Sequence, residues 1–510
     1  MHFIFLLLSA ILYTTTSAQV QSRPNIIFLL ADDQRADALS CAGNELIQTP
    51  NLDALAKEGQ RFTNAYSVAP ICKPSRVSFL LGQYQRTHGV GFSSKKKMNE
   101  DQWKNSYPTK LREAGYHTGF IGKFGVDNYT FKGKGAEKFD YWMAHDGWSK
   151  FFPKENENTA IYKKFKSNII TEIMGEAMED FLETAPTDKP FCLSLSFSAP
   201  HPSTATTMMD KSKGGWSMTK AANTNSLIKE HPIYGSLFRD QQVSFPSTMD
   251  GQPEKYLPLN VVDAENGRKK CYVYDYKKES LREHKYRYAQ LIHGIDHQIG
   301  KLVSSLKARD LDKNTIIIYS SDNGLLMGDY NQAGKGLLYD LAAKVPFIVF
   351  DPRLQADQRG KVNESLILSI DLAPTLLSYA GVEVPKTMQG TPLQGVINDP
   401  TSGRKDVLLE SLFALRGNPI VESIRDKRYK YVKYFRVPGQ LEAMAKGVKF
   451  FTYDYAVLEF STAAIHEQLF DTEKDPGETQ NLVNNPEYQQ VLKELRYKLQ
   501  KKSKERSNEI

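Results

Sequence analysis

Short apolar segments alternate with amphipathic segments along most of the chain. Residues 25–30 (NIIFLL) are apolar without a break, as expected of a strand that is buried on both faces. Residues 49–59 start with Thr and Pro and end with Gly, a pattern typical of a helix. Strands and helices in alternation predict an α/β fold with a large, mostly parallel sheet flanked by helices. Further strands are predicted at 116–121, 190–196, 315–320 and 345–350, and a further helix at 371–380.

The pattern changes at residues 385–400, which are rich in proline, glycine and polar residues. Beyond this segment, residues 406–412 and 424–435 are predicted to form antiparallel strands, and a charged helix is predicted at about 487–503. We therefore expect a large α/β domain over residues 19–390 and a smaller C-terminal α+β domain over residues 391–510.

The chain begins with an apolar run at residues 3–12, followed by small residues that end in Thr16-Ser17-Ala18. This pattern is typical of an export signal over residues 1–18. The alternative is a short membrane anchor, but the run is too short to span a bilayer, which takes about 20 apolar residues. We predict a secreted or periplasmic protein without stable membrane insertion.

The chain of 510 residues carries 66 basic and 59 acidic side chains, a net charge of +7. This excess is too small to indicate a nucleic-acid-binding protein, but it suits an anionic substrate. Four cysteines in a chain of this length do not form a disulfide scaffold. Cys192 lies inside a predicted strand and is interpreted as a buried thiol; Cys41, Cys72 and Cys271 are the others.

Polar side chains follow four of the predicted strands, where ligands of open parallel sheets bind. Three carboxylates and an amide among them suit a hard cation such as Ca²⁺ or Mg²⁺ rather than zinc. Alternatively, these residues cap helices or shape turns. Two such pairs, one of two carboxylates and one of a carboxylate and an amide, each behind a buried strand, favour a metal site. The residues are Asp32 and Asp33, Lys123, His201, and Asp322 and Asn323.

Residues 71–82 contain the most specific local pattern. Pro74 follows Cys72 by two residues and precedes a helical pattern that ends at Gly82, so Cys72 is predicted to lie at a helix N-terminus. The backbone N–H groups there favour an anion, and Arg76 is expected to point toward it as a bidentate donor. A lone cysteine is more often a small buried apolar residue, and only its context argues otherwise here.

Cys-Lys-Pro-Ser-Arg with a downstream glycine resembles the formylglycine signature of type I sulfatases, members of the alkaline phosphatase superfamily. The resemblance covers nearly the whole chain after the predicted signal. It implies an alkaline-phosphatase-like fold, hydrolysis of sulfate esters, and a Cys72 converted to 3-oxoalanine (formylglycine) by a maturation enzyme. The segments that carry it are LADDQR, TPNLDALAKEG, CKPSR, GYHTGFIGK, SFSAPH, SSDNG, AGKG and LFDTEKDPGETQNL.

The resemblance also implies roles for individual residues. Oxidised Cys72 is the nucleophile, and its hydrate is held by Arg76. Lys123 and Lys335 bind sulfate oxygens, while His201 contacts the bridging oxygen and helps to protonate the departing alcohol. A calcium ion, with Mg²⁺ as the alternative, is bound by residue 72 together with Asp32, Asp33, Asp322 and Asn323.

Three positions depart from the family pattern. The family commonly has Trp-His or Phe-His after the lysine, but here Phe124 and Gly125 follow Lys123. His88 and His145 are the candidates to replace this histidine. Leu81 stands where the modification signature usually has Thr, and the loop after Asn323 lacks a histidine that is often present.

Aromatic side chains suggest a sugar polymer as substrate, because aromatic faces stack on pyranose rings; Tyr141, Trp142, Trp148 and Trp216 are the candidates. Alternatively, they are core residues. We predict a sulfated polysaccharide such as ulvan or carrageenan, or a glycosaminoglycan. Two alternatives remain open: a formylglycine-dependent phosphodiesterase or phosphonate hydrolase, and an exported carbohydrate-binding pseudoenzyme.

Overall fold

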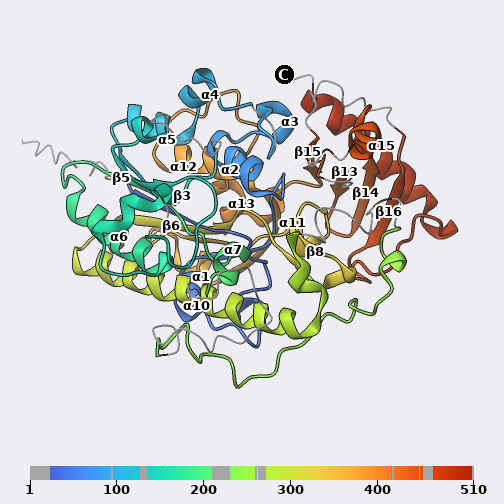
Figure 1. Cartoon of the computed structure of the whole chain (residues 1–510). Coiled ribbons are helices and arrows are strands. Elements are labelled where there is room, and N and C mark those ends of the chain that lie inside the picture. Colours follow the sequence, from blue (N-terminus) through green and yellow to red (C-terminus); the bar gives the residue numbers. More distant parts are fainter. Residues whose placement is uncertain are drawn as a thin grey trace, which may run out of the picture.

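The computed structural model describes residues 23–92, 96–126, 135–154, 157–208, 230–258, 261, 271–412, 414–415, 419–446, 448, 450–451 and 463–507 (Figure 1). The predicted signal peptide and Trp216 lie outside these residues. No helix within them has the length and apolar character needed to cross a membrane. Cys41, Cys72, Cys192 and Cys271 all carry free thiols.

Eight strands form the main sheet, in the order β10-β2-β9-β6-β1-β5-β3-β4. Strand β9 runs antiparallel to its neighbours β2 and β6, and every other pair in this sheet is parallel. The predicted α/β class with a mostly parallel sheet is therefore confirmed. The strands are β1 (Asn25–Ala31), β2 (Gln60–Tyr66), β3 (His117–Lys123), β4 (Tyr141–His145), β5 (Phe191–Ser196), β6 (Thr315–Ser321), β9 (Phe347–Phe350) and β10 (Lys361–Leu368).

Helices cover both faces of this sheet, because the central strands are apolar on both sides. Ile27 and Leu29 of β1 pack into a core shared with helices α1, α6 and α10, whereas Ile26 and Phe28 pack into a second core with α2, α5 and α12. Figure 1 shows these two layers, one on each side of the sheet. The helices are α1 (Pro50–Glu58), α2 (Cys72–Leu81), α5 (Tyr107–Glu113), α6 (Ile170–Thr184), α10 (Lys278–Ala308) and α12 (Leu372–Tyr379).

A second, four-stranded sheet lies beside the first, with the order β11-β13-β14-β16 and antiparallel pairing throughout. Its strands are β11 (Val407–Ser411), β13 (Ile420–Arg425), β14 (Tyr429–Phe435) and β16 (His466–Asp471). The C-terminal helix α15 (Gln489–Ser507) packs Leu492, Leu495 and Leu499 into a core that also contains Tyr66 and Leu337 from the larger part. This C-terminal unit of an antiparallel sheet and a helix agrees with the predicted α+β class. The domain boundary at residue 390 stays a prediction.

Shorter elements connect these layers. They are helices α3 (Gln85–His88), α4 (Glu100–Lys104), α7 (Pro202–Thr206), α11 (Asp340–Ala343), α13 (Gln394–Asn398) and α14 (Gln440–Ala445), and the strand pairs β7 (Leu326–Met327) with β8 (Ala333–Gly334) and β12 (Ala414–Leu415) with β15 (Phe450–Phe451).

A buried ion network joins α3 to the second sheet. Arg86 donates through Nε to Glu410 Oε2 at 2.5 Å and also bonds Glu422. Its backbone N–H donates to the other oxygen of Glu410 at 3.0 Å. All three side chains are almost fully buried, so each charge depends on its partners for solvation.

Candidate active site

The site lies at the carboxyl ends of four adjacent strands, in the sheet order β6-β1-β5-β3. Asp32 and Asp33 follow β1, and Asp322 and Asn323 follow β6. Lys123 is the last residue of β3, and His201 follows β5 and caps the N-terminus of α7. The structure thus brings the polar residues that follow the predicted strands to one edge of the sheet, where they are buried.

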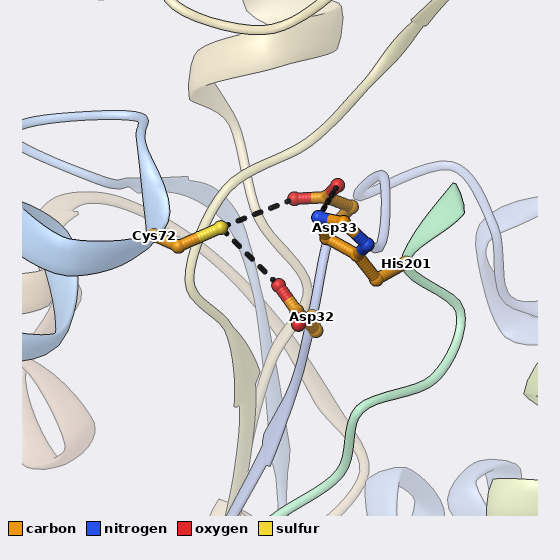
Figure 2. A group of neighbouring side chains, drawn as sticks. All are labelled: Asp32, Asp33, Cys72 and His201. Atoms are coloured by element: carbon orange, nitrogen blue, oxygen red, sulfur yellow. Dashed lines mark hydrogen bonds and ion pairs between the residues drawn. The ribbon is translucent and has the colours of Figure 1, made fainter. Parts of the chain in front are cut away.

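Cys72 faces this edge from the first residue of α2. Its Sγ lies 3.4 Å from Asp32 Oδ1 and 3.9 Å from Asp33 Oδ1 (Figure 2). Lys335, from the loop after β8, donates through Nζ to Sγ at 2.7 Å. Burial raises the pKa of the Cys72 thiol, although Lys123 and Lys335 oppose that rise. Unmodified Cys72 is therefore a protonated thiol at neutral pH, which is a weak nucleophile.

Arg76 lies one helical turn after Cys72 and ties α2 to four strand ends. Its guanidinium donates through Nε to Asp322 Oδ2 at 3.0 Å and through Nη1 to the carbonyl of Lys123 at 2.8 Å. Nη1 also donates to Ser196 Oγ at 2.5 Å. Nη2 lies 2.9 Å from Asp322 Oδ2 and 3.6 Å from Asp32 Oδ1. These contacts fix the guanidinium beside the carboxylates of the site.

Two lysines supply the positive charge that balances the buried carboxylates. Lys123 Nζ bonds Asp32 Oδ2, and Lys335 Nζ bonds Asp33 Oδ1. Burial by itself raises the pKa of Asp32, but Lys123 and Arg76 outweigh it and hold that pKa below its ordinary value. At Asp33 burial prevails over Lys335, and the pKa rises to about 6. The two adjacent carboxylates thus differ in pKa, which is lowered at Asp32 and raised at Asp33.

Two buried oxygens of the site lack a hydrogen-bond donor within the described part of the chain, namely Asp33 Oδ2 and Asn323 Oδ1. Buried acceptors without a donor are costly, and carboxylate and amide oxygens are the ligands that Ca²⁺ prefers. Asp32, Asp33, Cys72 and His201 present ligand atoms within 4.8 Å of one another. The residues present therefore fit a hard cation at this position.

Asp322 and Asn323 are committed in part to other contacts. Asp322 accepts from the backbone N–H of Asp33 at 3.1 Å through Oδ1 and from Arg76 through Oδ2. Asn323 donates through Nδ2 to Asp33 Oδ1 at 2.6 Å, which leaves its Oδ1 for a cation. These bonds order the ligand set before any ion binds.

The hydrogen bonds of His201 fix its tautomer. Its Nδ1 accepts from the backbone N–H of Ser203 at 3.0 Å, so the proton of the neutral ring resides on Nε2. Nε2 lies 3.6 Å from Asp33 Oδ2. Burial, together with Lys335 and Lys123, holds the pKa of His201 far below its ordinary value. His201 therefore presents a neutral N–H donor to the site.

Of the two candidate histidines, His145 lies beside the site. It ends β4 and is the register partner of Lys123 on β3. Its ring bonds the hydroxyl of Tyr162 at 2.6 Å and that of Ser198 at 3.1 Å. Burial, with Lys123 and Arg76, lowers its pKa to about 3. His88, in contrast, bonds Ser78 at 3.1 Å, about 9 Å along α2 from Cys72.

Gly125 occupies the position where the family often has histidine, and the structure gives a reason for the glycine. Its φ is +63°, a conformation that side chains rarely adopt. A Cβ there would lie 3.0 Å from Cδ of Arg76. The Arg76 side chain thus occupies space that a histidine at this position would need.

The aromatic candidates for sugar stacking divide into two groups. Trp142 packs among Phe120, Phe124 and Phe139, and Tyr141 bonds Asp180 through its hydroxyl, as core residues do. Trp148 is 48% exposed, and its ring lies against that of His201. The core interpretation therefore applies to the first two and not to Trp148.

Tyr272 is a neighbour of the site that the sequence did not single out. A Cβ at Gly334, one residue before Lys335, would lie 2.4 Å from the Tyr272 ring. Burial raises the pKa of Tyr272, and the positive charge of Lys335 opposes that rise. The glycines that flank Lys335 were the available signal, because close packing against a ring requires a residue without a side chain.

Comparison with known families gives two matches along the chain. A family model described as Sulfatase matches residues 24–382. A second model, described as N-sulphoglucosamine sulphohydrolase, C-terminal, matches residues 328–446 and 410–505. Together they extend over both sheets.

Individual relatives align over most of their length. An arylsulfatase of Clostridium perfringens is 29% identical over 93% of each chain. An N-acetylglucosamine-6-O-sulfatase of Bacteroides thetaiotaomicron is 28% identical over 95% of this chain and 87% of its own. An ulvan-active sulfatase of Formosa agariphila is 27% identical over 96% and 83%.

Solved structures share the fold. One protein, solved in complex with its substrate D-glucosamine-2-N,6-O-disulfate, superposes with a TM-score of 0.69 at 24% identity, over 96% of this chain and 99% of its own. A phosphonate monoester hydrolase of Agrobacterium radiobacter superposes with a TM-score of 0.69 at 19% identity, over 95% and 96%. At these identities the likeness concerns the fold alone.

Proposed function

This chain belongs to the sulfatase family and is a hydrolase of sulfate esters, and on that premise we propose that its substrate is a sulfated polysaccharide or oligosaccharide, ulvan among the candidates. In this proposal the nucleophile is a 3-oxoalanine made from Cys72, and a calcium ion is bound beside it. The observation that carries the proposal is the position of Cys72. Its Sγ lies 3.4 Å from Asp32 at a helix N-terminus, with Lys335 and His201 around the same point.

Residue 72 carries out the covalent chemistry in this proposal. After oxidation and hydration it is a geminal diol, of which one hydroxyl attacks sulfur as the alcohol leaves and the other then expels sulfate by re-forming the aldehyde. Arg76, held by Asp322 and by the Lys123 carbonyl, fixes this end of α2 against the strand ends.

The cation would be held by Asp32, Asp33, Asp322, Asn323 and residue 72. It would supply polarisation of the sulfuryl oxygens and lower the cost of ionising the diol. The free acceptor oxygens of Asp33 and Asn323 support this assignment.

Lys123 and Lys335 serve as the sulfate-binding cations in the proposal. Each ammonium group is now the counterion of a metal-site carboxylate. Two positive charges on a divalent ion would take over that task, which frees the lysines to bind the oxygens of the ester and to offset charge in the transition state.

His201 faces the leaving group in this arrangement. Its Nε2–H donates to the bridging oxygen of the ester, so that the alcohol departs with a hydrogen-bond donor already in place. A bound sulfate ester adds negative charge beside the ring and raises the pKa of His201 back toward its ordinary value, which favours the imidazolium form, the acid that can pass a proton to the departing alcohol and end as a neutral ring.

The substrate class rests on relatives that act on sulfated saccharides. One is named an N-acetylglucosamine-6-O-sulfatase and another an ulvan-active sulfatase. Export through the predicted signal peptide belongs to the same proposal, because an extracellular polymer is met outside the cell. Maturation by a formylglycine-generating enzyme belongs to it as well, because Cys72 has to be oxidised to 3-oxoalanine.

A substrate screen tests the proposal. Purified mature enzyme loaded with Ca²⁺ is incubated with desalted oligosaccharides from ulvan, carrageenan and glycosaminoglycans, and free sulfate is measured. Release of sulfate from one class supports the proposal. Hydrolysis of small aryl esters alone would contradict a saccharide substrate, and a strong preference for aryl phosphodiesters or phosphonates would favour the alternative hydrolase. No turnover of any ester by fully modified protein would favour a carbohydrate-binding pseudoenzyme.

A further inference from the structure

We infer that Trp148 is the stacking platform for the pyranose ring that carries the scissile sulfate. This inference rests on the proposed action on sulfated saccharides and goes beyond it, because it assigns a residue to the sugar rather than to the sulfate.

The position of Trp148 relative to the reacting centre is the first argument. Its indole ring and the imidazole of His201 are nearly parallel, at an angle of 26°, with centroids 6.4 Å apart. The Nε2 of His201 lies 3.6 Å from Asp33 Oδ2. The indole is thus separated from the metal-site carboxylates by a single imidazole ring, so an ester oxygen at Nε2 brings its sugar ring within reach of Trp148.

The exposure of Trp148 is the second argument. The indole is 48% exposed, whereas tryptophan is highly buried on average in folded proteins. Among the large exposed apolar side chains of the described residues only Trp148 and Tyr497 are aromatic, and Tyr497 lies on the C-terminal helix α15. An exposed aromatic face beside a catalytic edge offers a flat apolar surface that the sulfate group itself does not use.

The backbone around Trp148 is fixed, which is the third argument. The carbonyl of Ser149 accepts from Thr204 Oγ1 at 3.2 Å, and the N–H of Phe151 donates to Thr207 Oγ1 at 2.9 Å. Thr204 and Thr207 belong to α7 or its C-terminal cap, and His201 is the N-cap of the same helix. Helix α7 and its caps therefore position both rings, and the indole is in place before the substrate binds.

The chemistry of stacking selects a ring with an apolar C–H face. A pyranose presents such a face, and the electron-rich face of an indole attracts it. An acyclic or purely ionic ligand gains nothing from the indole. The platform therefore predicts that Trp148 contributes to the KM for saccharide sulfates and not to binding of the sulfate anion.

Steady-state kinetics of Trp148→Ala, Trp148→Leu and Trp148→Phe test this inference. The substrate is the sulfated oligosaccharide that the wild-type enzyme turns over best, and inorganic sulfate serves as a competitive inhibitor without a sugar. Removal of the ring is expected to raise the KM about tenfold, with kcat within about threefold of wild type and an unchanged inhibition constant for sulfate. Trp148→Phe should recover most of the loss. Tyr497→Ala, which removes an exposed aromatic ring from α15, should change none of these values.

Two kinetic results would overturn the inference. An unchanged KM for Trp148→Ala and Trp148→Leu would show that the indole does not contact the sugar, while the proposed function would stand. A rise in the sulfate inhibition constant together with a shifted pH profile would show that Trp148 acts through His201. Leucine keeps the site filled, so a failure of the alanine variant to fold leaves the leucine result decisive. If wild-type enzyme hydrolyses no sulfated saccharide, the proposed function fails first and the platform with it.

Discussion

His145 and Lys123 are register partners on the parallel strands β4 and β3, at the edge of the sheet that carries the site. Burial lowers the pKa of the His145 ring, and the positive charges of Lys123 and Arg76 lower it further, so the ring lies within electrostatic reach of the site. We expect His145→Gln to lower kcat about tenfold to a hundredfold, measured with the preferred substrate at neutral pH. His88→Gln is the matched control, since His88 bonds Ser78 far along α2, and it should retain activity within about threefold. Equal activity of the two variants would contradict a role of His145 at the site.

Replacement of Cys72 tests the nucleophile. Cys72→Ala and Cys72→Ser should lower turnover by at least about 10³-fold, because both remove the source of the aldehyde. Both should keep the thermal unfolding midpoint within a few degrees, since a small side chain at the sheet edge contributes little to the core. Mass spectrometry of the peptide that contains residue 72 provides the direct check. A fully active enzyme that carries only unmodified thiol would contradict the assignment.

Removal of the cation tests the metal site. Chelation by EGTA should abolish turnover and lower the thermal midpoint, and Ca²⁺ should restore both; at a hundredfold excess over its Kd, an ion adds about 2.7 kcal/mol to the free energy of unfolding. Asn323→Leu removes one of the proposed oxygen ligands and should lose the Ca²⁺-dependent shift of the midpoint. Asn64→Ala, on β2, should keep it. A chelator-insensitive midpoint in wild type would contradict a resident cation.

The free energy of unfolding should depend on pH through His88. Burial lowers its pKa to about 3 from an ordinary 6.5, so between these values the unfolded chain binds a proton that the folded chain does not. The stability that the neutral, buried His88 ring contributes is present above pH 6.5 and is lost as the pH falls toward 3, by up to about 1.4 kcal/mol per pH unit. The difference in stability between wild type and His88→Gln should therefore shrink as the pH falls from 6.5. Urea unfolding at several pH values measures this difference, and parallel curves would contradict it.

The junction between the two sheets depends on the buried ions. Glu410→Gln leaves Arg86 partly unpaired in the interior, and we expect a loss of about 3–5 kcal/mol in the free energy of unfolding. Glu442→Ala is the control, because its partner Lys446 is 70% exposed and such a pair contributes little. Urea unfolding midpoints compare the two. A Glu410→Gln variant as stable as the control would show that the second sheet docks by apolar contacts alone.

The predictability of the sheet differs between its strands. β1, β5 and β6 are buried along their whole length, and their largely apolar sequences alone indicate buried strands. β2 and β10 mix polar with apolar side chains and sit toward the edge of the sheet, where part of each strand is only partly buried or exposed, so they lacked that signal. The antiparallel direction of β9 depends on which strands it pairs with, a tertiary property that no local pattern contains.

The same distinction applies to the site. Residues that follow buried strands were foreseeable, because strand ends converge in a parallel sheet. The proximity of His145 to Lys123 was not, since it requires the pairing of β4 with β3. The contrast between Trp142 and Trp148 was not foreseeable either. Trp148 follows Trp142 by only six positions, yet Trp142 packs among phenylalanines while Trp148 meets solvent beside His201.

The burial of Cys72 has a consequence for the order of events in the life of the chain. Only 4% of this residue is accessible in the finished fold, and it is enclosed by segments that are made much later, among them residues 322 and 335. A second protein that oxidises the thiol could not reach it there. On the proposal that residue 72 becomes 3-oxoalanine, oxidation would have to precede folding, while the segment around residue 72 is still extended, and a molecule that folded first would keep an unmodified thiol.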